Sequence, residues 1–356
     1  MIILHTSDLH IGSPLTSRLD GERARTRRRE ISDSLRRVTE AAKKNSACAV
    51  IIAGDLFDTD AVSERELDSV LRDIRAADLS FYYLPGNHEK NVLKSSSLKL
   101  PDNLFIFDED WTYFEVGDTV IAGRSLTDKN MFDSLRLNPS LKNIVVLHGE
   151  ARAKSETGGA IGIKEAADRG ISYLALGHYH SYSHFPVDAL GVAVYSGTPE
   201  GRGFDECGEC GAVIIDTDSP YPYHRFIKTA SRTLHSLEVS LDGAASGADI
   251  ESAVKGAVEG IPKSDIVRIS LVGRVERGAW IDTEGLAEML SRRLFYAEVY
   301  DKTGIRISEN DFANDSGIRG ELVRSVLADG SLTDKEKEKI IVCALAALDG
   351  ESYFGE

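Results

Sequence analysis

The first half of the chain alternates short apolar runs with amphipathic segments. The runs are continuous and rich in β-branched and aromatic residues, which is typical of strands buried on both faces. Five runs are followed at once by Asp, Asn or His residues, and they cover residues 1–4, 49–53, 81–84, 144–147 and 171–176. Because the carboxyl ends of neighbouring parallel strands meet at one edge of a sheet, we expect these polar residues to lie close together.

Two amphipathic segments separate the first three runs. Residues 22–45 carry apolar side chains such as Ile31 and Leu35 at intervals of three or four, which predicts one helix packed against the sheet. Residues 63–77 repeat this pattern after a Ser63-x-x-Glu66 capping box. The order strand, helix, strand, helix, strand indicates parallel crossovers.

Beyond residue 100 the pattern changes to short strands separated by turns. Residues 104–107, 111–116 and 119–123 are typical of antiparallel hairpins, and residues 192–195 and 211–215 continue the pattern. We therefore predict an α/β (α+β) fold, a two-sheet β-sandwich flanked by helices, followed by a smaller C-terminal α/β domain.

The length of 356 residues exceeds what one hydrophobic core usually fills, so two domains are expected. The segment around 218–222 breaks regular structure, and we place the domains at residues 1–228 and 229–356. In the second domain the pattern predicts strands at 234–241, 266–272 and 296–301, helices at 250–258 and 283–294, and terminal helices around 319–327 and 335–348.

Composition narrows the class of protein. With 42% hydrophobic and 28% charged residues, no apolar run of roughly 20 residues and no signal-peptide pattern, the chain is expected to be cytoplasmic. Four cysteines form no disulfide framework in a chain of this length. Cys207 and Cys210 have CxxC spacing but lack the second pair that a structural zinc site needs.

The formal net charge of −15 means that a polyanion must be met by a local basic cluster or by a partner. Arginines crowd residues 18–37, and the candidates for nucleic-acid binding are Arg18, Arg23, Arg27 and, further along, Arg202. A solvated helix face paired with Glu22, Glu30 and Glu40 explains the same cluster, so both interpretations stay open.

The polar residues after the five strands supply seven oxygen and nitrogen ligands, namely Asp8, His10, Asp55, Asn87, His148, His178 and His180. Seven such ligands suit two divalent cations that share a carboxylate such as Asp55. Imidazole ligands favour manganese, iron or zinc over magnesium, and the amide of Asn87 adds no negative charge. Two such cations clamp a phosphate and activate a bridging water, which predicts phosphoester hydrolysis without a covalent intermediate.

His88 directly follows Asn87, so we expect it at the rim of the metal pair. From there it would donate a hydrogen bond or a proton to the leaving oxygen. The alternative is a histidine that only orients its loop.

The motifs 6–12, 53–58, 84–89, 148–149 and 177–180 resemble those of the calcineurin-like metallophosphoesterases, and more narrowly those of SbcD-type DNA repair nucleases. Residues 196–206 and, weakly, the strand region 265–273 are similar to the same nucleases. The resemblance implies that one metal is held by Asp8, His10, Asp55 and His180. It implies that the other is held by Asp55, Asn87, His148 and His178, with His88 as the catalytic histidine.

The same resemblance implies manganese as the metal, DNA as the substrate, a homodimer and an SbcC-type coiled-coil ATPase as the partner. Two positions depart from the pattern of relatives. Asp58 stands where archaeal and eukaryotic relatives commonly have a histidine, which leaves the DNA ends and the exonuclease step open. Glu89 replaces the commoner aspartate and keeps its charge.

Two other functions compete with a DNA nuclease. One is a phosphodiesterase or phosphatase for small nucleotides or other phosphoesters on the same metal pair. The other is a non-catalytic adaptor that docks onto an ATPase. Intact ligand positions and His88 argue against the adaptor, because a scaffold needs none of them.

Overall fold

The computed structural model describes residues 1–348 except 16–18, 90–91, 94–95, 126–127, 156–158, 220–222, 276–279, 306–311 and 313–314. The chain divides into two compact units, Met1–His235 and Ser236–Glu356. The functional assignment of the two units stays a prediction, and each unit is described by itself.

The first unit contains two six-stranded sheets. The first sheet has the order β14-β13-β1-β2-β3-β4 and the second has the order β11-β12-β10-β7-β6-β5. Strands β1, β2, β3 and β4 are parallel neighbours, as are β6, β7, β10 and β12. The first sheet consists of β1 (Ile2–Thr6), β2 (Ala49–Ala53), β3 (Ser80–Leu84), β4 (Leu104–Ile106), β13 (Gly211–Asp216) and β14 (Tyr223–Lys228). The second consists of β5 (Thr112–Val116), β6 (Thr119–Gly123), β7 (Lys142–His148), β10 (Tyr173–Gly177), β11 (Ser183–Pro186) and β12 (Val192–Tyr195).

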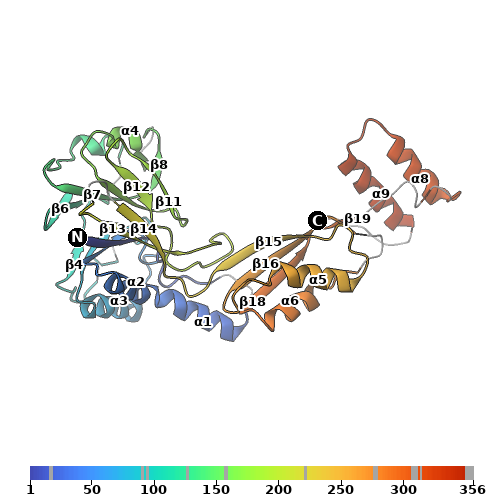
Figure 1. Cartoon of the computed structure of the whole chain (residues 1–356), viewed down its shortest axis with the longest axis horizontal. Coiled ribbons are helices and arrows are strands. Elements are labelled where there is room, and N and C mark those ends of the chain that lie inside the picture. The colour runs from blue at the N-terminus through green and yellow to red at the C-terminus, as the bar shows by residue number, and fades with distance from the viewer. Residues whose placement is uncertain are drawn as a thin grey trace. The chain divides into compact units, whose positions relative to one another are not determined.

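The two sheets pack face to face. Side chains from both sheets, including Ile3, Ile51, Ile144 and Val213, form one buried cluster between them. Helices α2 (Ser34–Lys44) and α3 (Glu64–Ala76) pack on the outer face of the first sheet, and Figure 1 shows both beneath it. Helix α1 (Gly21–Ser32) precedes α2 and contacts it. The outer face of the second sheet is covered by the short elements η1 (Met131–Asp133) and α4 (Ile163–Ala166). The predicted two-sheet sandwich flanked by helices is confirmed.

The apolar runs form the central strands for a physical reason. Every residue of β2 and β10 is buried, because one face meets the helices or outer elements and the other meets the opposite sheet. Alternating polar residues would leave unpaired polar groups in one of these layers. At the edge of the second sheet, β5 shows the alternating exposure expected of a half-buried strand.

Two local predictions are wrong. The single helix over residues 22–45 is two helices, α1 and α2, which are separated at Asp33. Ser32, Asp33 and Ser34 have short polar side chains that compete for backbone hydrogen bonds, and Ser32 Oγ donates to Arg28 O at 3.0 Å. The strand at 104–107 does not belong to a hairpin, because β4 adds to β3 as a parallel strand of the first sheet.

The remaining predicted elements of the first unit fit the structure closely. The capping box at Ser63 and Glu66 is formed at the start of α3. The 111–116 and 119–123 strands form the antiparallel hairpin β5–β6. A small two-stranded sheet of β8 (Glu150–Arg152) and β9 (Ala160–Gly162) was not predicted.

The second unit is built on a three-stranded sheet. Its order is β15-β16-β18, with β15 (Leu234–Ser240), β16 (Ile266–Val272) and β18 (Tyr296–Asp301). Helices α5 (Gly247–Ala257) and α6 (Thr283–Ser291) cover one face, where Val254, Ile269 and Leu290 share a core. The described residues of this unit also form β17 (Arg274–Val275), β19 (Gly304–Ile305), α8 (Ile318–Ala328) and α9 (Asp334–Leu348). Among the described residues, no helix has the length and hydropathy of a membrane span.

Candidate metal centre

The five predicted loops meet at the carboxyl ends of β1, β2, β3, β7 and β10. Four of the candidate ligands have backbone angles in the left-handed region, with φ of 54° at Asp8, 47° at His10, 52° at Asp55 and 107° at His178. Residues other than glycine rarely adopt this region, and such strain persists where the surrounding structure fixes it, most often at functional sites.

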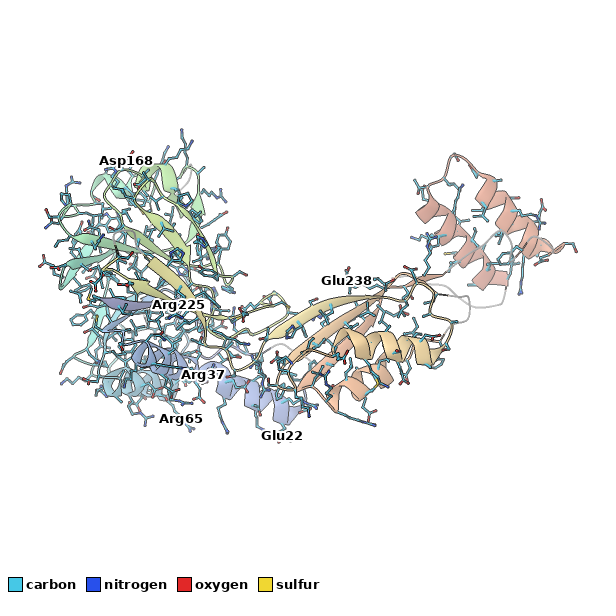
Figure 2. The ribbon with its side chains drawn as sticks, in the orientation of Figure 1. Glu22, Arg37, Arg65, Asp168, Arg225 and Glu238 are labelled. Carbon is cyan, nitrogen blue, oxygen red and sulfur yellow. The ribbon has the colours of Figure 1, made fainter. Side chains whose placement is uncertain are left out.

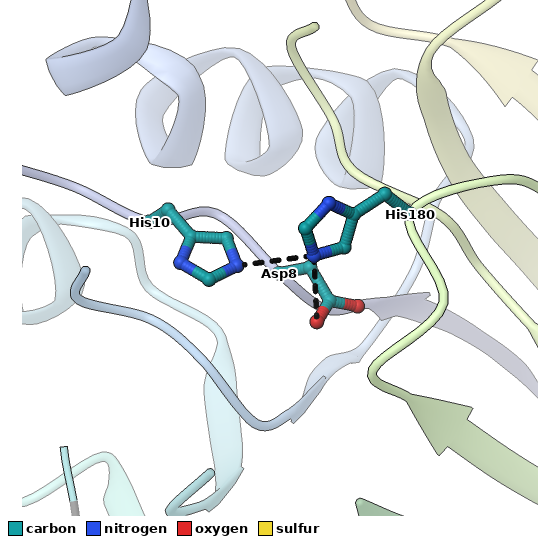
Figure 3. Close-up of side chains that lie close together, drawn as sticks. All are labelled: Asp8, His10 and His180. Carbon is teal, nitrogen blue, oxygen red and sulfur yellow. Dashed lines mark hydrogen bonds and ion pairs between the residues drawn. The ribbon is translucent and has the colours of Figure 1, made fainter. Parts of the chain in front are cut away.

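Asp8, His10 and His180 form the first group of candidate ligands (Figure 3). The Nε2 atoms of His10 and His180 lie 3.3 Å apart, and His180 Nε2 lies 3.9 Å from Asp8 Oδ1. Asp8 is fixed by Ser7, whose hydroxyl donates to its carboxylate at 2.5 Å. Three side chains from two distant loops therefore point their ligand atoms at one place.

His148 is the centre of the second group. Its Nε2 lies 3.0 Å from Asn87 Oδ1 and 3.3 Å from Asp55 Oδ2. The ring of His178 packs edge-on against that of His148, with centroids 5.5 Å apart. The backbone N–H of His178 donates to both Asp8 oxygens at 3.0 and 3.1 Å, which ties the second group to the first.

Asp55 stands between the two groups. Its Oδ2 is 3.8 Å from His10 Nε2 and 3.3 Å from His148 Nε2, so one carboxylate faces a histidine of each group. All seven residues predicted as ligands are thus brought together. Their coordination of metal stays a proposal.

The donor atoms fit a pair of cations. His148 Nδ1 lies 2.9 Å from Ala53 O, and because a carbonyl can only accept, the proton belongs on Nδ1 and the Nε2 lone pair faces two oxygens. A proton on Nε2 would relieve this repulsion, and so would a cation. Burial opposes that proton, but the hydrogen bond and charge of Asp55 outweigh burial and raise the pKa of His148 to about 9. Burial also raises the pKa of Asp55, but its interaction with His148 outweighs this effect and lowers the pKa to about 2. A divalent cation would take the place of that proton.

His88 lies exposed at the edge of the centre. Its ring centroid is 5.0 Å from that of His10, and its backbone N–H donates to Asp55 Oδ1 at 3.2 Å. Its Nδ1 lies 2.8 Å from the carbonyl oxygen of Asp58, so Nδ1 carries a proton and Nε2 is left to face solvent or substrate.

Glu89, next in the chain, fixes the loops that carry Asp55 and Asn87. Its Oε1 accepts the backbone N–H groups of Leu56 at 3.0 Å and Gly86 at 3.1 Å, and the hydroxyl of Tyr83 at 2.9 Å. The negative charge of Glu89 is therefore not its only contribution to the site. Its buried carboxylate joins two loops that are separate in sequence.

The four arginines predicted to bind nucleic acid are placed differently. Arg18 lies outside the described residues, and Arg23 pairs with Asp20 at the start of α1. Arg27 is only 1% exposed and is hydrogen bonded to Glu30, Glu200 and the carbonyl of Gly201. Arg202 is hydrogen bonded to Asp58 and Glu206 beside the metal centre.

Glu200 also pairs with a second arginine, which lies on α2. Arg37, labelled in Figure 2, donates to Glu200 Oε2 at 2.8 Å, and the backbone N–H of Ser231 donates to the same oxygen at 2.6 Å. Arg37 and Arg27 thus hold the helical layer to the loop after β12. Neither Glu200 nor Glu206 is predictable from local sequence as a site residue, because their partners are distant in the chain. Only the resemblance of residues 196–206 to nucleases marks the segment.

Comparison with known proteins identifies the class of this fold and site. The family of calcineurin-like phosphoesterases matches residues 1–182, and the chain belongs to this family. Members of the family use two divalent metal ions, in agreement with the groups of ligands found here. The fold and the site therefore define the class of protein as a metallophosphoesterase.

Among curated proteins, the chain is similar to the DNA double-strand break repair protein Mre11 of Sulfurisphaera tokodaii, with 26% identity over 241 residues, 62% of this chain and 60% of the relative. It is 23% identical over 249 residues to the uncharacterized metallophosphoesterase YhaO of Bacillus subtilis, covering 63% of this chain and 60% of YhaO. Mre11 of Sulfolobus acidocaldarius is 25% identical over 301 residues, 77% of this chain and 76% of the relative. The chain thus spans about three fifths of the length of the first two relatives.

Proposed function

We propose that this protein is a metal-dependent DNA nuclease that hydrolyses phosphodiester bonds at the centre between the five loops. The observation that carries the proposal is the convergence of seven candidate ligands and His88 at the carboxyl ends of strands from both sheets. Asp55 faces a histidine of each group at 3.3 and 3.8 Å, as a carboxylate shared by two cations requires.

The residues divide into two ligand sets. One set is Asp8, His10, Asp55 and His180, and the other is Asp55, Asn87, His148 and His178. When bound, two divalent cations, manganese by resemblance, supply Lewis-acid polarisation of the phosphoryl group and a water of lowered pKa. The protein holds the ligands rigidly through strand ends, strained loops and the contacts of Ser7 and Glu89.

His88 acts on the leaving group. Its Nδ1–H is held by the Asp58 carbonyl at 2.8 Å, which fixes the ring and directs Nε2 away from the loop. A protonated Nε2 then donates to the oxygen that leaves the phosphorus. Such proton donation typically contributes ~10²–10⁴-fold to a rate.

Similarity to Mre11 proteins supports DNA as the substrate and DNA repair as the process. We further propose an SbcC-type coiled-coil ATPase as the partner and a homodimer as the working state. Exposed arginines of α1, including Arg25, Arg28 and Arg29, are the candidates for contacts with phosphate.

A small phosphodiester is the second candidate substrate, and a specific observation favours it. Several basic side chains near the centre are paired internally, among them Arg27, Arg37 and Arg202. Together with the net charge of −15, this leaves fewer cations for a long polyanion than a free-standing DNA-binding protein commonly has.

The test is an assay of the purified full chain with Mn²⁺ on linear duplex DNA and on bis-p-nitrophenyl phosphate. Wild-type protein, His88→Ala and the control His184→Ala are compared. His184 is an exposed histidine on β11, and its ring contacts Tyr182 and His224 rather than any described residue of the centre. We expect His88→Ala to lower DNA cleavage by ~10²-fold or more and His184→Ala to leave it unchanged.

Each outcome separates the candidates. Cleavage of DNA that depends on His88 supports the nuclease. Turnover of the small diester without DNA cleavage supports the second candidate. No turnover of either substrate with Mn²⁺ bound overturns both and favours a non-catalytic adaptor.

A further inference from the structure

Three residues behind the first ligand group form a charged cluster, which we call the Arg202 cluster. It consists of Asp58, Arg202 and Glu206, and it contacts His10 and His180 on the side away from their Nε2 atoms. Asp58 follows β2, whereas Arg202 and Glu206 lie in the loop between β12 and β13. The cluster therefore joins two loops that are far apart in sequence.

Glu206 fixes the ring of His180. Its Oε1 lies 2.7 Å from His180 Nδ1, and a carboxylate oxygen accepts the Nδ1–H. This places the proton on Nδ1 and leaves the Nε2 lone pair facing His10. Glu206 is itself only 3% exposed, so its position is set by packing and hydrogen bonds.

Asp58 plays the corresponding part at His10. Its Oδ1 lies 3.1 Å from His10 Nδ1, within the range of an ion pair although without the alignment of a hydrogen bond. A lone pair at Nδ1 would face this carboxylate oxygen, so the proton is favoured there. The Nε2 atoms of the two rings, 3.3 Å apart, then present two lone pairs to a single point.

Arg202 connects the two carboxylates. Its Nη1 donates to Asp58 Oδ1 at 2.9 Å and its Nη2 donates to Glu206 Oε1 at 2.6 Å. Its backbone N–H donates to Glu206 Oε2 at 2.6 Å, and Nη2 also lies 3.3 Å from His180 Nδ1. One planar guanidinium thus sets the spacing of both carboxylates and offsets their charge.

We propose that the Arg202 cluster positions His10 and His180 so that both Nε2 atoms bind the same cation, and that it acts on this one cation and not on the second. The proposal rests on the proposed metal centre. Arg202 is then a positioning residue and not a contact to nucleic acid. A carboxylate that accepts the outer N–H of a ligating imidazole fixes its tautomer and raises its basicity.

The cluster is expected to act on only one cation because the second ligand group has different partners. His148 donates its Nδ1–H to a backbone carbonyl, Ala53 O, and not to a carboxylate. Asn87 and His178 make no contact with the Arg202 cluster among the hydrogen bonds of the described residues. Loss of the Glu206 or Asp58 side chain should therefore weaken binding of the cation held by His10 and His180. The affinity for the cation held by Asn87, His148 and His178 should stay unchanged.

The test is a Mn²⁺ titration of the full chain by calorimetry, with Mn²⁺ electron paramagnetic resonance to count bound ions. We expect wild-type protein to bind two ions. Glu206→Ala should weaken one of them by ~10–100-fold and change the other by less than about threefold. Glu206→Gln, which keeps an accepting oxygen, should recover part of the loss.

Asp205→Ala is the matched control, because Asp205 is the exposed neighbour with the same charge and should leave both affinities unchanged. If Glu206→Ala does not fold by circular dichroism, Asp58→Ala tests the same expectation at a partly exposed side chain. Two ions bound with unchanged affinities in either folded variant overturn the role of the cluster but not the centre. Equal weakening of both ions also overturns it. Failure of the wild-type chain to bind two ions overturns the centre itself.

Discussion

Gly86 lies directly against the carboxylate of Asp55. A β-carbon at Gly86 would be 2.0 Å from Asp55 Oδ1 and 2.5 Å from the Asp55 backbone nitrogen, far inside any real contact. The loop after β3 can approach the loop after β2 only because residue 86 has no side chain. The carboxylate proposed to bridge two cations is therefore held in place by a glycine from another loop.

Gly86→Ala should disable the centre. The added methyl group must displace Asp55 or the loop that carries Asn87 and His88, and a misplacement of about 1 Å commonly costs ~10²-fold in rate. We expect a loss of at least this size in kcat and weaker Mn²⁺ binding, measured by steady-state hydrolysis and calorimetry. Gly21→Ala, at the first position of α1 with no atom within 4 Å, is the control and should behave like the wild type. Full activity of Gly86→Ala would contradict the proposed role of Asp55.

Glu89→Ala should lower both stability and metal affinity. The change leaves the N–H groups of Leu56 and Gly86 and the hydroxyl of Tyr83 without their acceptor, at a cost of roughly 1–3 kcal/mol for each buried group left unsatisfied. Glu89→Gln retains the accepting oxygen and should recover most of the free energy of unfolding. Urea denaturation of the three proteins, with and without Mn²⁺, measures both effects. Equal stability of the Ala and Gln variants would show that the shared acceptor is unimportant.

Sequence alone could predict the sandwich and the ligand loops because both depend on local patterns. Buried strands such as β2 have continuous apolar runs, and the polar residue after each run must lie at the sheet edge. Other features depend on distant partners. Nothing near β4 indicates which sheet it joins, and Glu206 acquires a function only because folding brings it to His180. The break at Asp33 was missed because apolar spacing continues across it.

Arg27→Met should destabilise the fold rather than the activity of the folded protein. Arg27 and Glu200 are each 1% exposed and pair at 2.7 Å, so removal of one partner leaves a buried charge. Removing one partner of a buried ion pair lowers the free energy of unfolding by roughly 3–5 kcal/mol. Glu200 keeps its ion pair with Arg37, so we expect a loss near the lower value. Glu200→Gln in the same chain should restore part of this, as a double-mutant cycle of chemical denaturation would reveal. Arg36→Met is the control, because its ion pair with Glu40 is more than half exposed and should contribute under about 1 kcal/mol. Additive effects of the Arg27 and Glu200 changes would refute the coupling.

His5 should make the protein sensitive to acid. Burial lowers its pKa to about 3, and Nδ1 is held by the Tyr173 hydroxyl at 3.0 Å. In the unfolded chain the pKa is near 6.5, so below that pH the unfolded state binds a proton that the folded state excludes. Stability contributed at neutral pH is therefore lost as pH falls from about 6.5 towards 3, by ~1.4 kcal/mol per pH unit from this residue.

His5→Gln should flatten this dependence. Differences in unfolding free energy between the variant and the wild type, measured at pH 7.5, 6 and 5, report on His5 together with its electrostatic interaction with His224, because the remaining histidines contribute equally to both proteins. His184→Gln, at an exposed position, serves as the control. The proposal for His5 is contradicted if the difference between variant and wild type is the same at all three values of pH.

The arginines of α1 allow DNA and small phosphodiesters to be distinguished as substrates. Arg28 and Arg29 are exposed on the helix, whereas the guanidinium of Arg27 on the same helix is buried in internal hydrogen bonds. If α1 follows a phosphate backbone, Arg28→Ala should weaken DNA binding and reduce the slope of log K against log salt concentration by ~0.9 for each phosphate that the variant no longer neutralises. Arg65→Ala, an exposed arginine on α3, provides the control for net charge.

Fluorescence anisotropy with labelled duplex DNA over a series of salt concentrations measures the slope. An unchanged slope in Arg28→Ala and Arg29→Ala, together with unchanged KM for bis-p-nitrophenyl phosphate, would remove α1 from the DNA interface. In that case the acidic chain would need a partner to hold DNA at its metal centre.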